Sequence, residues 1–317
     1  MPSYSGVWNL VSVYQAVAQG NWPDPNATFA YVGAGRNSGV DTSAVTKINF
    51  DSGGVTSGFA TLSAATTYLA SFSSATRGFW AGGLNTANVI QYITLADGGS
   101  AVDFGDISTT TDYEQCGLSN STRGVISGLK NTNAPVNVIE YITMSSASNS
   151  SDFGDLTVTR GSMGAAASTT RGLFSGGRNF GVYYGTTDYI TIATTGNATN
   201  FGSLTVSRQA TAGSSNSTRA LLSGGFDNNY LNVIDYYTIA TTGGATDFGD
   251  LISGVAYPAS AANTVRSLTM GGSGNHSTGS NVIQYVTLAT TGNATDFGDL
   301  SAPIFGAAAC SSAHGGL

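Results

Sequence analysis

The tetrapeptide Asp-Phe-Gly-Asp occurs four times in this chain, at residues 103–106, 152–155, 247–250 and 296–299. Two weaker copies occur as Asn-Phe-Gly-Ser at 200–203 and Gly-Phe-Ala-Thr at 58–61. Successive phenylalanines are separated by 45, 49, 48, 47 and 49 residues. A repeat of this length, rich in strand-forming residues and turns, is typical of one blade of a β-propeller.

Each repeat predicts four strands, as residues 161–206 illustrate. A segment of small side chains at 161–168 comes first, and a short apolar segment follows that ends at Gly176 and Gly177. Polar and apolar residues then alternate over 188–192, and the outermost strand begins at Phe201. Small residues suit the crowded axis of a propeller, and we expect each phenylalanine to pack between neighbouring blades.

The two ends of the chain complement each other. Residues 29–35 match the second strand of a repeat, whereas residues 306–312 match the small-residue first strand that this repeat lacks. We therefore predict an all-β fold, a six-bladed β-propeller of four-stranded blades in which the N- and C-terminal strands share one blade. Such closure leaves no long unpaired sheet edge.

The order of strands resembles the kelch repeat of β-propellers. Gly176 with Gly177, Tyr189 and Arg160 occupy the places of that family's glycine doublet, tyrosine and interblade arginine. The resemblance covers roughly residues 28–312. It departs at the family's usual tryptophan, which Phe201 and its equivalents replace, and the resemblance therefore implies a kelch-like scaffold.

Composition excludes several classes of partner. The net charge is −7, with only 9% charged residues and two lysines, so no basic surface is predicted and nucleic acid is not an expected partner. No run of eighteen apolar residues predicts membrane insertion, and no signal-peptide pattern is present at the start. Synthesis and folding in a reducing cytoplasm are expected, and Cys116 and Cys310 lack the clustered spacing of a metal site.

The sequence does not predict an enzyme, and we expect no catalytic residues, cofactor or metal. Asp-Phe-Gly is a magnesium-binding motif in kinases, but here it is repeated without the catalytic and phosphate-binding loops. Eleven of the eighteen acidic residues fall at repeated positions, which include Glu140, Asp188 and Asp235. A calcium site built from the repeated aspartates is the alternative to a role in turns.

One arginine also recurs in each repeat after the first, at Arg77, Arg123, Arg171, Arg219 and Arg266, with Phe29 at the first position. Two interpretations are open. The arginines could form a carboxylate clamp at the centre, or each could donate hydrogen bonds to carbonyl groups of the neighbouring blade. A residue needed in every blade favours the second interpretation.

The loop after each glycine pair varies between repeats, and all six loops should project from one rim. Tyrosine, phenylalanine and asparagine supply flat faces and amide groups suited to sugars or proteins. The candidate ligand- or receptor-binding residues are Phe180, Tyr183, Tyr184, Asn228, Asn229 and Tyr230. Variable loops are also expected in any repeat scaffold without a binding role.

Residues 1–25 form a separate segment before the propeller, which we place at residues 26–317. A short helix is predicted from an N-cap at Asn9 to Gly20. This segment either covers the underside of the propeller or docks into a partner through aromatic and apolar anchors, for which Trp8, Leu10, Tyr14 and Trp22 are the candidates.

This opening segment, together with the repeated Tyr-Ile-Thr-Ile-Ala-Thr-Thr-Gly-Asn-Ala-Thr pattern, resembles tailed-bacteriophage virion proteins. The resemblance implies a structural protein of the virion exterior, such as a tail fibre or decoration, made in the host cytoplasm. Its partners would be other virion proteins in an oligomeric assembly and a glycan or protein of the host surface. A soluble carbohydrate-binding propeller is the alternative, followed by a glycan-acting enzyme.

Overall fold

The computed structural model describes residues 28–109, 114–128, 130–131 and 134–313. These residues form strands and turns without any helix, which confirms the all-β class. Within these residues no helix is long and apolar enough to cross a membrane. The segment at residues 1–25, with its expected helix, lies outside the described part of the chain.

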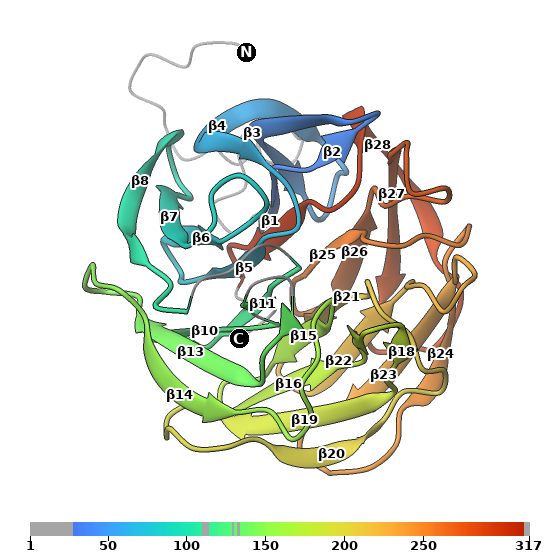
Figure 1. Ribbon diagram of the computed structural model, residues 1–317. Helices are drawn as coiled ribbons and strands as arrows, with labels where there is room; N and C mark the ends of the chain where they lie inside the picture. The colour runs from blue at the N-terminus through green and yellow to red at the C-terminus, as the bar shows by residue number, and fades with distance from the viewer. Residues whose placement is uncertain (1–27, 110–113, 129, 132–133, 314–317) are drawn as a thin grey trace, which may run out of the picture.

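Four separate antiparallel sheets of four strands each follow one another along the chain (Figure 1). The first contains β9 (Cys116–Ser119), β10 (Arg123–Ser127), β13 (Val138–Thr143) and β14 (Ser151–Asp155). The second contains β15 (Gly164–Ala167), β16 (Arg171–Ser175), β19 (Thr186–Thr191) and β20 (Thr199–Ser203). The third and fourth contain β21 (Ala212–Ser215), β22 (Arg219–Ser223), β23 (Val233–Thr238) and β24 (Thr246–Asp250), and β25 (Ala259–Ala262), β26 (Arg266–Met270), β27 (Ser280–Thr287) and β28 (Thr295–Ile304).

Of the remaining strands, β11 (Lys130–Asn131) pairs with β12 (Ala134–Pro135) and β17 (Arg178–Asn179) with β18 (Val182–Tyr183), and nine others form one sheet. Its two halves are β29 (Ala308–Ser311), β1 (Phe29–Gly33), β3 (Val40–Asn49) and β4 (Val55–Thr66), and β8 (Gly98–Asp106), β7 (Val89–Thr94), β6 (Arg77–Ala81) and β5 (Ala70–Ser73). Two parallel residue pairs, Ala60 with Gly99 and Thr61 with Ser100, join β4 to β8. This junction, which arises where β4 and β8 are unusually long, was not predicted. The short β2 (Arg36–Asn37) pairs with β3.

The first and last strands pair with each other, as expected from the sequence. β1 and β29 are antiparallel, with Ala30 opposite Ser311 and Val32 opposite Ala309. β1 is also paired on its other side with β3, where Val32 lies opposite Thr46. The start and the end of the described chain therefore share one sheet.

The first strands of the six repeats make a closed circuit of contacts, in the order β5, β9, β15, β21, β25, β29 and back to β5. Just before each of these strands, one residue with a left-handed φ donates its backbone N–H to the equivalent carbonyl of the preceding repeat. These six N···O distances, 2.7–3.2 Å, close a circle through Tyr68, Glu114, Ser162, Ala210, Tyr257 and Gly306. We call these six residues the inner ring.

Aromatic side chains of the outer strands fill the space between sheets. Phe201 on β20 packs with Leu173 of its own sheet and with Leu222 and Tyr237 of the next sheet. The Phe201 and Tyr237 ring centroids are 5.4 Å apart in an edge-to-face arrangement, a favourable geometry for buried rings. The expected packing of this phenylalanine between neighbouring sheets is confirmed.

The glycine of the tetrapeptide is needed because the next sheet approaches closely. A Cβ on Gly154, whose φ is +142°, would lie 2.5 Å from the backbone of Gly196 in the following hairpin turn. That turn donates from Gly196 N to Phe153 O at 2.7 Å, and Asn197 Oδ1 accepts from Asp155 N at 3.0 Å. The motif thus joins one outer strand to the turn of the next sheet.

Candidate functional site

The repeated arginines bind carbonyl groups of the following sheet. Arg171 Nη1 lies 3.0 Å from Ile239 O and 2.8 Å from Ala240 O, and its guanidinium stacks over Tyr189 at 4.9 Å. The same pattern holds for Arg77, Arg123, Arg219 and Arg266. The second interpretation of these arginines is confirmed, and they do not form a central clamp.

The first repeat, which has Phe29 in place of this arginine, reaches the equivalent carbonyl in another way. Buried Tyr31 donates its hydroxyl to Leu95 O at 2.8 Å. Burial raises the pKa of Tyr31 well above its ordinary value, with a further contribution from Cys310. The phenol is therefore a neutral donor that substitutes for the arginine.

The buried repeated aspartates Asp188 and Asp235 are structural as well. Asp188 accepts from Thr157 N and from Arg160, and Asp235 accepts equivalently from Thr205 N and Arg208. The four ion-paired side chains of Arg160, Asp188, Arg208 and Asp235 have no exposed surface. Each arginine also donates hydrogen bonds to backbone carbonyl oxygens of its sheet. The arginine and the aspartate of each pair therefore stabilise the connection between two sheets.

Glu140 occupies the corresponding place in its repeat without an arginine. Burial alone would raise its pKa, but hydrogen bonds from Ser150, Thr109 and Ser108 outweigh this effect and lower the pKa below its ordinary value. Gln91 and Gln284 accept backbone N–H groups at the same position of other repeats. This position therefore holds a hydrogen-bond acceptor in several repeats.

The loops after the glycine pairs carry the residues that the repeated framework leaves unused. In the fourth repeat, β17 (Arg178–Asn179) and β18 (Val182–Tyr183) form a hairpin whose turn residues Phe180 and Gly181 both have positive φ, at 43° and 85°. Such a turn matches the twist of a two-residue hairpin loop. The Phe180 side chain is 81% exposed at its tip.

Three successive loops bring rings together at one place. Phe226 lies 6.2 Å from Tyr183, 5.2 Å from Tyr230 and 4.7 Å from His276, measured between ring centroids. Tyr183 also donates its hydroxyl to Asn228 Oδ1 at 3.3 Å. We call Tyr183, Phe226, Asn228, Tyr230 and His276 the rim cluster. It combines four aromatic faces with an amide at a partly exposed surface.

The rim cluster contains three of the six predicted binding residues, Tyr183, Asn228 and Tyr230. Among the described residues, Phe180 and Tyr184 make no ring contact with the cluster. Asn229 bonds within its own loop, to Asp227. The proposed docking residues Trp8, Leu10, Tyr14 and Trp22 lie outside the described residues.

A charged group connects the rim cluster to the inner ring. Arg178 Nη2 lies 3.6 Å from Glu114 Oε1, which also accepts the hydroxyl of Tyr257 at 3.0 Å. Burial raises the pKa of Tyr257 well above its ordinary value, and the adjacent Glu114 carboxylate acts in the same direction. The Tyr257 phenol therefore keeps its proton and donates a hydrogen bond to Glu114 over the physiological pH range.

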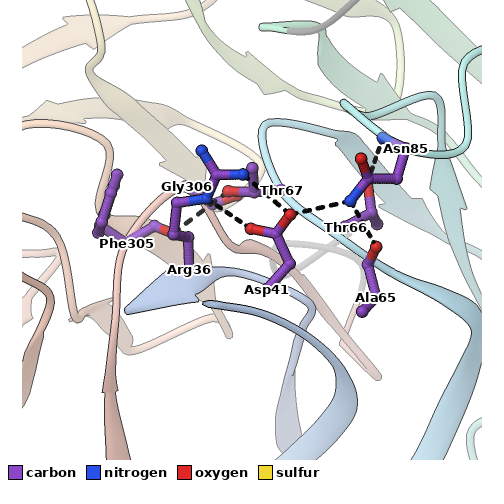
Figure 2. Close-up of polar contacts among 8 residues, drawn as sticks. All are labelled: Arg36, Asp41, Ala65, Thr66, Thr67, Asn85, Phe305 and Gly306. Carbon is purple, nitrogen blue, oxygen red and sulfur yellow. Dashed lines mark hydrogen bonds and ion pairs between the residues drawn. The ribbon is translucent and has the colours of Figure 1, made fainter. Parts of the chain in front are cut away.

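An equivalent arginine elsewhere on the rim has a different partner (Figure 2). Arg36 binds Asp41 through two hydrogen bonds, of 2.6 and 3.0 Å, and Asn85 Nδ2 donates to the same carboxylate at 2.8 Å. Residues 36–41 and 178–183 read Arg-Asn-Ser-Gly-Val-Asp and Arg-Asn-Phe-Gly-Val-Tyr. Because Tyr183 replaces the aspartate, Arg178 has no carboxylate within its own hairpin and contacts Glu114.

Sequence reasoning missed Glu114, Arg178, Tyr257, Phe226 and His276. An alignment of the repeats could have found Glu114 and Tyr257. Aligning the repeats places Glu114 and Tyr257 in a column with Ser162, Ala210 and Gly306, where side chains differ widely although the following strand consists mostly of small residues.

No known protein-family model matches this chain, and no curated protein matches it either. Among the described residues, no group of three or more His, Cys, Asp or Glu side chains is arranged to hold a metal ion. Cys116 and Cys310 are both buried and free, and burial raises the pKa of the Cys116 thiol to about 12. Side chains that differ from repeat to repeat come together at the rim cluster and at the inner ring.

His276 provides a pH-dependent test of this arrangement. Burial and, secondarily, the charge of Arg178 lower its pKa below the ordinary 6.5, so its stabilising contribution is complete above that pH and is lost as pH falls through the folded-state pKa. Replacing Arg178 by glutamine should raise the pKa of His276 part of the way toward 6.5, because burial remains. An NMR titration of the imidazole measures this pKa. An unchanged pKa in the variant would contradict an electrostatic effect of Arg178 on His276.

Proposed function

We propose that this protein is a non-enzymatic binding scaffold, a six-bladed kelch-like β-propeller that uses its rim cluster to contact a partner. The observation that carries the proposal is the convergence of Tyr183, Phe226, Tyr230 and His276 from three loops onto one partly exposed surface. Tyrosines and asparagine at such a surface provide large contact area together with adaptable hydrogen bonds.

The propeller interpretation has three supports. The first strands of six repeats contact one another in a circuit, the inner ring links all six through backbone hydrogen bonds, and β1 pairs with β29. In this interpretation the nine-stranded sheet comprises two blades that touch at β4 and β8. The rim loops then radiate from one end of a rigid body, which is how repeat scaffolds present variable binding surfaces.

The absence of enzymatic activity is proposed because the repeated arginines and the buried repeated acidic residues are engaged in structural contacts. Asp188 and Asp235 hold buried arginines, Glu140 accepts hydroxyl and backbone groups, and the remaining repeated arginines bind carbonyl oxygens. A reaction centre needs a nucleophile or an acid–base pair in mutual reach. The framework leaves few ionisable side chains for that purpose.

We place this scaffold on the exterior of a tailed-phage particle, as a fibre, decoration or host-attachment component. Support comes from the resemblance of the opening segment and of the repeats to virion proteins. In this proposal Trp8, Leu10, Tyr14 and Trp22 dock onto other virion proteins, and the rim cluster faces a subunit or the host surface. A soluble carbohydrate-binding propeller is the second candidate, favoured by the combination of stacked rings with the Asn228 amide.

Alanine at both Tyr183 and Tyr230 should weaken partner binding about 30-fold or more, the effect of removing contact residues worth roughly 2 kcal/mol. Stability should change little because both side chains are partly exposed. Purified phage particles from the culture that expresses the chain provide the assay: mass spectrometry detects the protein, and adsorption to host cells measures binding.

Val265→Ala is the matched control, since this exposed residue lies in the turn between β25 and β26, at the opposite end of the sheet from the rim loop. Absence of the protein from particles, with glycan-array binding that depends on the two tyrosines, would favour the soluble lectin. Equal adsorption by the tyrosine and Val265 variants would reject the rim cluster as the contact surface.

A further inference from the structure

An apolar groove of about 400 Å³ lies between the end of β28 and the first sheet. One wall consists of residues of β1 and β3, and the other consists of residues 300–304. Pockets of roughly 300–1,000 Å³ with mostly hydrophobic walls hold drug-sized ligands, so this groove has room for one large side chain. Its apolar lining includes Val32, Ala34, Val40, Leu300, Pro303 and Ile304.

The groove exists because two long side chains found at other junctions between sheets are absent here. Arg160 pairs with Asp188 of the next sheet, and both side chains are fully buried. Ile304 stands in the place of that arginine, seven residues after the phenylalanine of the tetrapeptide. Thr46 pairs with β1 at the register where Asp188 pairs with β16. These two shorter side chains leave the space between the sheets open.

The missing arginine also leaves a backbone carbonyl without a donor. Arg160 Nε donates to Gly176 O at 2.8 Å, and the residue equivalent to Gly176 is Ala34, with a φ of 64° compared with 70°. The next N–H, of Gly35 and of Gly177, donates to the equivalent carbonyl at 2.9 and 2.8 Å, so the two peptide groups have the same orientation. Ala34 is buried, and within the described part of the chain its carbonyl accepts no hydrogen bond. An N–H donor in the groove is therefore favoured.

The lining favours a neutral donor over a cation. Among the described residues, the lining contains one ionisable side chain, Asp41, and Arg36 and Asn85 already bind its carboxylate (Figure 2). A guanidinium in the groove would therefore lack a free counter-charge. An indole carries one N–H donor and no acceptor on a large apolar body. Trp80 uses the same chemistry in this chain, since its buried indole donates to Ala308 O at 3.1 Å.

The sequence before β1 supplies an indole of sufficient reach. Residues 1–23 contain no charged side chain, and they include Trp8 and Trp22. Trp8 precedes Thr28 by 20 residues, which span up to about 65 Å. Thr28 and Ala34, at the two ends of β1, are separated by about 20 Å of strand. Trp22 precedes Thr28 by only six residues, at most about 20 Å, and has no length left for a path around the sheet.

We propose that Trp8 of the same chain occupies this groove in the free protein, with its indole N–H directed at Ala34 O and its ring against Leu300 and Ile304. The inference concerns the isolated protein and does not rest on the proposed function. A virion protein that takes up Trp8, as proposed above, would first have to displace it from the groove. The groove thus holds the docking segment against the first sheet until a partner binds.

Acrylamide quenching of tryptophan fluorescence tests this contact in the full-length Trp22→Phe variant. Of the three tryptophans, this variant keeps Trp8 and the fully buried Trp80. The quenching constant of Trp8 should lie well below that of N-acetyltryptophanamide. Adding Ala302→Glu, at an exposed position of the lining, places a carboxylate in the apolar groove and should raise the constant to that of the free compound. Val265→Glu is the matched control and should keep Trp8 protected, because Val265 is exposed at the opposite end of a sheet.

Circular dichroism checks the fold of each variant, and Ala44→Glu, at another exposed position of the lining, makes the same comparison if Ala302→Glu does not fold. A Trp8 as accessible as N-acetyltryptophanamide without the groove substitution would overturn the proposal. Protection that survives the glutamate in the groove would also overturn it, because Trp8 would then be covered elsewhere. Protection that is lost on dilution would assign the tryptophan to a second copy of the chain and contradict the intramolecular contact.

Discussion

Replacing Asp188 by alanine should lower the free energy of unfolding by about 3–5 kcal/mol, because it leaves the guanidinium of Arg160 buried without its counter-charge. The ion pair, at 2.9 Å, has no exposed surface. Asp188 also accepts from Thr157 N and Thr157 Oγ1, so its loss leaves further polar groups unpaired. Urea unfolding followed by circular dichroism measures the change.

Two variants separate the buried pair from general effects of losing an aspartate. Asp152→Ala removes an exposed carboxylate from the tetrapeptide and should change stability by no more than about 0.5 kcal/mol. Replacing both partners, with Arg160→Met and Asp188→Leu, should recover much of the loss, since no charge then remains buried. An Asp188→Ala variant as stable as wild type would contradict the structural role assigned to this carboxylate.

Removing residues 306–317 should abolish cooperative unfolding, the second large effect. The truncation deletes β29, leaves β1 as an open edge and breaks the inner ring at Gly306. It also removes the carbonyl of Ala308, which accepts the indole N–H of fully buried Trp80 at 3.1 Å. These losses together are comparable with the roughly 5–15 kcal/mol by which a domain is stable.

Differential scanning calorimetry provides the measurement for this truncation. Removal of residues 314–317 alone is the control, because it keeps the whole of β29 and should retain a sharp transition. A truncated chain that lacks residues 306–317 but still unfolds cooperatively near the wild-type temperature would show that β29 is dispensable for closure.

Much of the framework was predictable because the same strands and turns recur in each repeat. Glycine and asparagine at 196 and 197 indicated the hairpin turns, small residues indicated the crowded first strands, and the complementary ends indicated the pairing of β1 with β29. The arginine contacts with carbonyl groups were also predictable, since a residue present in nearly every repeat must serve the repeat itself. The junction of β4 with β8 was not, because it depends on strand lengths specific to the first two repeats.

The sites were less predictable because they arise from departures from the repeat. Tyr183, Asn228 and Tyr230 were found by composition, but their contact depends on the conformations of separate loops. His276 is a single histidine in a loop, and nothing near it in sequence indicates its contact with Phe226. Glu114 becomes informative only when its left-handed backbone and its neighbours in the inner ring are known.

Backbone nuclear Overhauser effects across β1 test the central claim, closure of the chain through its first and last strands. Contacts between Val32 and Ala309 and between Ala30 and Ser311 are expected on one side of the strand, together with the contact between Val32 and Thr46 on the other side. Presence of the Thr46 contact without the Ala309 and Ser311 contacts would contradict closure and with it the inner ring.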